Sequence, residues 1–106
     1  MVIDVPRASS LMRARAPEWQ VVHARYAALG PDLIARVRPD CILMPLFGPG
    51  YDALAVLERM ATLDYAGSFA VLTARLPAPE VVRAELRAAA GARPLYLLLF
   101  DPVRRV

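Results

Sequence analysis

The sequence contains no lysine, so all 13 of its basic residues are arginine. A GC-rich genome, which favours arginine and alanine codons, accounts for this composition. The absence still has a chemical consequence, because no lysine amine is available to form a Schiff base or to bind a phosphate as a point charge. The arginines are scattered among 10 acidic residues, and the net charge is only +3. This distribution does not predict contact between this domain and nucleic acid.

Cysteine and long apolar segments are also scarce. Cys41 is the only cysteine, so the chain has neither an internal disulfide nor a cysteine-based zinc cluster. The longest strongly apolar run, Leu95–Phe100, has the length of a strand and not of a membrane span. The first residues lack the basic segment and the long apolar core of a signal peptide. We therefore expect a cytoplasmic protein that does not enter a membrane and that binds no metal or other cofactor.

Apolar runs alternate with helical patterns along the 106 residues, which we interpret as a single domain over residues 1–106. A weak helix is expected over 7–16, and further helices begin near Pro31, Asp52 and Pro77. Strands separated by single helices require right-handed crossovers, which make the sheet parallel. We therefore predict an α/β fold with a doubly wound, flavodoxin-like sheet of strand order 2-1-3-4-5. Its five strands are expected over 2–5, 19–24, 41–47, 68–73 and 95–100.

The most informative stretch begins with the apolar run 41–47, which is typical of a strand that is buried on both faces. The sequence Gly48-Pro49-Gly50 then predicts a tight turn. Asp52 suits the cap of the helix that follows. A strand, a glycine-containing turn and a helix in this order form half of a parallel α/β unit.

This stretch resembles the third strand, the following loop and the helix start of response-regulator receiver domains. The residues in register with the family's pattern are Pro39, Asp40, Pro49, Gly50 and Asp52. The segment 72–74 also resembles the end of the family's fourth strand. The resemblance implies the receiver fold. In an ordinary member of the family it also implies transfer of a phosphoryl group to an aspartate at the end of the third strand.

Most of the residues that the resemblance assigns to this chemistry are replaced. The phosphoacceptor position falls on Pro45, which has no oxygen nucleophile. The acidic pair that holds Mg²⁺ in receivers is reduced to Asp4. The lysine of the fifth strand is absent, with Asp101 as its nearest equivalent, and only Thr73 keeps its role as the hydroxyl residue of the fourth strand. The resemblance therefore implies a degenerate receiver-like domain that is not an enzyme and cannot be phosphorylated at the usual site.

The short first helix and the missing fifth helix predict an interaction surface. Relative to receivers, the first helix is short, and the chain stops where the fifth helix would begin. Several residues among Val2, Ile3 and 95–100 are then expected to face water, and an exposed apolar patch marks a contact site. We predict a homodimer, or docking to a protein partner, through this face or through the edge formed by the fourth helix and the fifth strand. The function predicted is signal transduction by protein–protein interaction.

Two other functions stay open. The same fold serves small ligand- or nucleotide-binding proteins, with Gly48, Gly50 and Tyr51 as candidates for a ligand-binding rim at the carboxyl ends of the strands. The glycine spacing matches neither the Rossmann pattern nor the P-loop, so a tight turn is the better interpretation. The chain could also be a fragment of a transcription regulator whose DNA-binding domain lies elsewhere.

Overall fold

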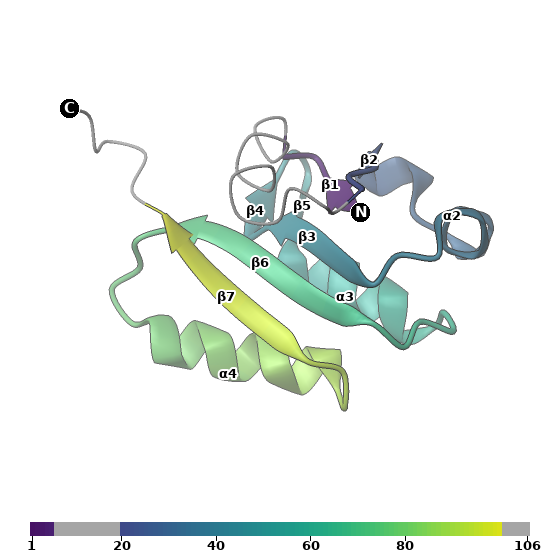
Figure 1. Cartoon of the computed structure of the whole chain (residues 1–106). Helices are drawn as coiled ribbons and strands as arrows, with labels where there is room; N and C mark the ends of the chain where they lie inside the picture. Colours follow the sequence, from purple (N-terminus) through teal and green to yellow (C-terminus); the bar gives the residue numbers. More distant parts are fainter. Residues whose placement is uncertain (6–19, 101–106) are drawn as a thin grey trace.

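The computed structural model describes residues 1–5 and 20–100, which form an α/β fold around a five-stranded parallel sheet (Figure 1). The spatial order of the strands is β2-β1-β3-β6-β7, and each neighbouring pair is parallel. Counted along the chain, this is the order 2-1-3-4-5 that the sequence predicts. Strands β2 and β7 therefore form the two edges of the sheet. The strands are β1 (Val2–Ile3), β2 (His23–Ala24), β3 (Cys41–Pro45), β6 (Ser68–Ala74) and β7 (Leu95–Phe100).

The main core lies between one face of the sheet and three helices, α2 (Pro31–Val37), α3 (Ala53–Ala61) and α4 (Pro79–Ala90). A short 3₁₀ helix, η1 (Tyr26–Ala28), precedes α2. The largest fully buried side chains of this core are Ile3, Ile42, Met44, Val56, Leu57, Met60, Phe69, Val71 and Leu86. No helix in the described part of the chain is long and apolar enough to cross a membrane. The helix expected over 7–16 lies outside the described residues.

Three helix ends follow directly from the sequence. The carboxylate of Asp52 accepts a hydrogen bond of 2.9 Å from the backbone N–H of Ala55, which confirms the predicted cap of α3. Helix α4 begins at Pro79, whose fixed backbone angle suits the first turn. It ends at Gly91, whose φ of 69° lies in the left-handed region that glycine adopts without strain.

The opposite face of the sheet carries a smaller cluster, formed by Val2, Leu43 and Ala70. The sequence predicts that several residues among Val2, Ile3 and 95–100 face water. Val2 and Ile3 do not, because β1 lies inside the sheet between β2 and β3 and both side chains are buried. The members of this set that are exposed lie on the edge strand β7, where Tyr96, Leu98 and Leu99 are 56%, 42% and 48% exposed.

Strands β1 and β2 are shorter than predicted. The position of Pro45 explains why β1 is short. The backbone N–H of Leu43 donates to the carbonyl of Met1 at 2.8 Å, which pairs β3 with β1. Because alternate residues of a strand face the same neighbour, the next donor toward β1 would be residue 45. Proline has no N–H, so the pairing cannot continue there. The chain then turns at Asp4, whose φ is 49°.

The prediction of one buried strand over 41–47 is also wrong. Strand β3 ends at Pro45, and a separate hairpin follows, in which β4 (Phe47–Gly48) runs antiparallel to β5 (Tyr51–Asp52). Its two connecting residues are Pro49 and Gly50. Proline followed by a glycine at φ 80° is the pattern of a type II turn. The hairpin turns Phe47 outward, where 75% of its surface is exposed.

Candidate functional site

The predicted rim residues lie along one edge of the sheet. Because the strands are parallel, Asp4, Pro45 and Thr73 stand at or just beyond the carboxyl ends of β1, β3 and β6. The hairpin that carries Gly48 and Tyr51 begins two residues after β3 ends and covers part of this edge (Figure 1). Asp101 lies outside the described residues, so its predicted role cannot be placed in the fold.

The carboxylate of Asp4 holds two segments of chain against β1. Its Oδ2 atom accepts a hydrogen bond of 3.0 Å from the phenol of Tyr51 and another of 3.1 Å from the backbone N–H of Tyr26. Burial raises the pKa of Tyr51 above its ordinary value, and the hydrogen bond to Asp4 raises it further. In this contact the phenol is protonated and acts as the hydrogen-bond donor.

An aromatic stack completes this arrangement. The rings of Tyr26 and Tyr51 are stacked, with centroids 4.3 Å apart and an angle of 12° between the planes. The guanidinium carbon of Arg59 lies 4.2 Å from the centroid of the Tyr26 ring, and Nη1 of Arg59 donates to the Tyr26 carbonyl at 3.1 Å. We call these four residues, Asp4, Tyr26, Tyr51 and Arg59, the tyrosine cluster. It joins β1, η1, the hairpin and α3 at the carboxyl edge of the sheet.

Gly48 makes room for the ring of Tyr51. A Cβ atom at this position would lie 2.3 Å from Cζ of Tyr51, closer than any side chain tolerates. Gly50 supplies the positive φ of the turn. In this structure the two glycines therefore shape the hairpin, as the tight-turn interpretation predicts. Gly48 also makes room for the ring of Tyr51, which that interpretation did not predict.

Pro45 and Thr73 stand apart from the cluster. Pro45 is half-buried at the end of β3 and offers neither a nucleophile nor a backbone donor. Thr73 is buried, and the alternation along β6 places it on the same face as Val71, toward the helices. Both hydrogen bonds that the structure shows for the Asp4 carboxylate come from Tyr51 and Tyr26. Within residues 1–5 and 20–100, no group of three or more His, Cys, Asp or Glu side chains could hold a metal ion.

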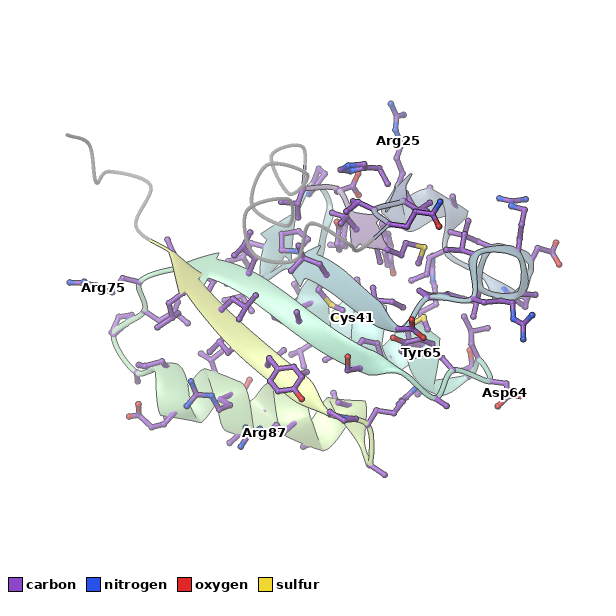
Figure 2. All side chains as sticks on the ribbon, in the orientation of Figure 1. Arg25, Cys41, Asp64, Tyr65, Arg75 and Arg87 are labelled. Atoms are coloured by element: carbon purple, nitrogen blue, oxygen red, sulfur yellow. The ribbon has the colours of Figure 1, made fainter. Side chains whose placement is uncertain are left out.

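Two hollows in the described surface lie at the other end of the strands. A groove of about 740 Å³ runs between α2 and the loop 63–67, and a smaller one of about 350 Å³ lies beside the start of β3. Figure 2 shows Asp64 and Tyr65 at this end of the sheet, with Arg75 at the opposite end. The phenol of Tyr65 donates to the carbonyl of Ser68 at 2.6 Å, and burial raises its pKa. The ligand rim expected at the carboxyl edge therefore does not coincide with either hollow.

Sequence reasoning selected Asp4 and Tyr51 but missed Tyr26 and Arg59. These two residues lie 33 positions apart, and neither belongs to a motif or an apolar period. They are recognised only once the chain has folded. A scan of protein-family models and searches of curated proteins and solved structures found no match to this chain.

Proposed function

We propose that this chain is a receiver-like module with a flavodoxin-like fold that takes part in signal transduction without being phosphorylated. It acts by binding protein, as a dimer or with another partner, and performs no catalysis. The strand order β2-β1-β3-β6-β7 and the turn and helix cap that follow β3 are compatible with this assignment.

The observation that carries the proposal is the use of Asp4. In the receiver family the carboxylates that follow the first strand bind Mg²⁺, which a phosphoryl transfer requires. Here Oδ2 of Asp4 accepts hydrogen bonds from Tyr51 and Tyr26, and Val5 follows it in place of a second acid. A metal ion bound through Oδ2 would have to displace these donors. Asp4 would also have to serve alone where the family has a pair of acids.

Two further features support the same conclusion. Pro45 occupies the phosphoacceptor position, and no lysine exists anywhere in the chain to bind the phosphoryl oxygens. The tyrosine cluster ties the hairpin to β1, so that the former active-site edge is held by structural contacts. Three exposed apolar residues, Tyr96, Leu98 and Leu99, lie together on the edge strand β7. These features favour a role in protein contact over a role in phosphoryl transfer.

Incubation with acetyl phosphate and Mg²⁺, followed by intact-mass measurement, tests the proposal. The expected result is an unchanged mass. An authentic receiver domain that retains its aspartate serves as the positive control under the same conditions. A phosphoryl adduct on this chain would overturn the proposal.

A further inference from the structure

Among the described strands, β7 is paired on one side only, with β6. It forms one side of the sheet and consists of six residues, Leu95–Phe100, without a charge, a proline or a glycine. Folded proteins normally protect an edge of this length with lysine, proline or a bulge, because its free N–H and C=O groups pair with any other strand. In addition, Tyr96 and Leu98 expose about half of their side chains on one face, and Leu99 does so on the other. This strand therefore needs a partner.

We propose that the partner is a second copy of this chain, bound by antiparallel pairing of β7 with β7. The inference rests on the proposed function, since it specifies which contact makes the dimer. It joins the two sheets into one continuous sheet across a two-fold axis.

The free backbone groups of β7 can be identified from its pairing with β6. The N–H of Phe69 donates to the carbonyl of Pro94 at 2.8 Å, and Phe69 lies opposite Leu95 in the register. Because the direction of the N–H and C=O groups alternates along a strand, Tyr96 and Leu98 also direct theirs toward β6. The groups that point to the open edge are therefore those of Leu95, Leu97 and Leu99.

One symmetric register uses all of these groups. When the two-fold axis passes beside Leu97, Leu97 faces its own copy, and Leu95 faces Leu99 of the second copy. Each such pair exchanges two N–H···O bonds. Tyr96 then lies opposite Leu98 of the second copy in a position without hydrogen bonds, where side chains approach most closely. The register thus covers the exposed tyrosine ring with the exposed leucine, and it brings no charge against a like charge.

The opposite edge of the sheet argues against a chain of copies. A head-to-tail assembly would pair β7 with β2, which is only two residues long, His23–Ala24. Most of the backbone N–H and C=O groups at the open edge of β7 would then stay unpaired. The self-pairing of β7 is closed, since it leaves no second long edge free, and symmetric dimers of this kind are the commonest oligomers.

Light scattering at micromolar concentration tests the proposal on the full chain. The expected result is a dimer for the wild type. Leu98→Lys places an ammonium group beside Tyr96 of the second copy, and we expect it to weaken the dimer by about tenfold or more. Val22→Lys is the matched control, because Val22 is similarly exposed, at 38%, but lies next to β2 at the other edge. It should leave the dimer unchanged.

Cross-linking tests the register independently of these charges. In a Cys41→Ala background, the pair Tyr96→Cys and Leu98→Cys should form an intermolecular disulfide readily, since positions 96 and 98 of the two copies face each other. Leu98→Cys alone should cross-link poorly, because the two copies of position 98 are offset. Circular dichroism establishes that each variant is folded.

A monomeric wild type would overturn the proposal. So would a dimer that both lysine variants leave intact. Equal cross-linking of the single and the double cysteine variants would also overturn it. None of these results bears on the reaction with acetyl phosphate. A phosphoryl adduct would in turn overturn the proposed function without affecting the dimer. The two failures are therefore distinguishable.

Discussion

The phenol of Tyr51 donates a hydrogen bond of 3.0 Å to the carboxylate of Asp4, and this contact joins residues that are 47 positions apart in the chain. It fixes the hairpin that follows β3 to the end of β1. The same oxygen of Asp4 also binds the backbone of Tyr26. The carboxylate of Asp4 thus holds the hairpin and η1 against the end of β1.

Removal of this hydrogen bond should lower stability by a measurable amount. Tyr51→Phe keeps the ring that stacks on Tyr26 but loses the donor to Asp4, so we expect the free energy of unfolding to fall by about 1 kcal/mol. Urea unfolding measures the change. Tyr96→Phe is the control, because that phenol is exposed on β7, and it should change stability little. Equal effects of the two substitutions would show that the Tyr51 hydrogen bond contributes nothing.

The close approach of Gly48 to Tyr51 predicts a coupling between the two positions. Gly48→Ala forces the ring away from its seat, and we expect it to lower the free energy of unfolding by about 1–3 kcal/mol, the range for overpacking. In a Tyr51→Ala background the same substitution should cost much less, since the ring is gone. A double-mutant cycle measures this difference.

A matched glycine serves as the control for that cycle. Gly30→Ala adds a Cβ with nothing within 4 Å on an extended backbone, so it should cost only the loss of a glycine at the N-cap of α2, about 1 kcal/mol or less, in either background. If Gly48→Ala costs the same with and without the Tyr51 ring, the seating of the ring is not the reason for glycine at position 48.

Stability should decrease in alkaline solution. Burial raises the pKa of Tyr51 and of Tyr65 above the ordinary value of 10.0, so the folded chain keeps both protons where the unfolded chain loses them. Because the folded state then binds more protons, the free energy of unfolding is unaffected by these groups below about pH 10 and falls as the pH rises above it. Urea unfolding between about pH 8 and about pH 11 measures the slope. Tyr51→Phe should reduce it, and an unchanged slope would contradict the contribution of Tyr51.

If the proposed function is correct, a carboxylate at position 45 should not make the chain a phosphoryl acceptor. Pro45→Asp supplies the missing nucleophile, but Asp4 stays bonded to Tyr51 and Tyr26, and the chain still has no lysine. We therefore expect no mass increase when this variant is incubated with acetyl phosphate and Mg²⁺. A phosphoryl adduct that forms on the variant would show that Pro45 alone blocks the reaction and that Asp4 is available to a metal.

Local signals in the sequence predicted much of the fold. Strand β7 has the predicted limits, Asp52 caps α3, and Gly91 ends α4, because each depends on an uninterrupted apolar run or on the backbone preference of one residue. The strand order also follows from the alternation of strands and helices.

Features that depend on several distant segments could not be predicted. The run 41–47 is apolar throughout, and its one signal against a continuous central strand is Pro45, which cannot donate a hydrogen bond. Nothing in the run shows that Phe47 belongs to a hairpin. The tyrosine cluster combines β1, η1, the hairpin and α3. No periodicity connects Tyr26 or Arg59 with Asp4, so only the tertiary structure brings them together.

The central claim is that the chain acts through protein contact and not through a phosphoryl switch. Sedimentation velocity of the full chain, with and without acetyl phosphate and Mg²⁺, tests both parts at once. We predict a dimer with the same sedimentation coefficient under both conditions. A monomer under both conditions, or an association state that changes with acetyl phosphate, would contradict this account.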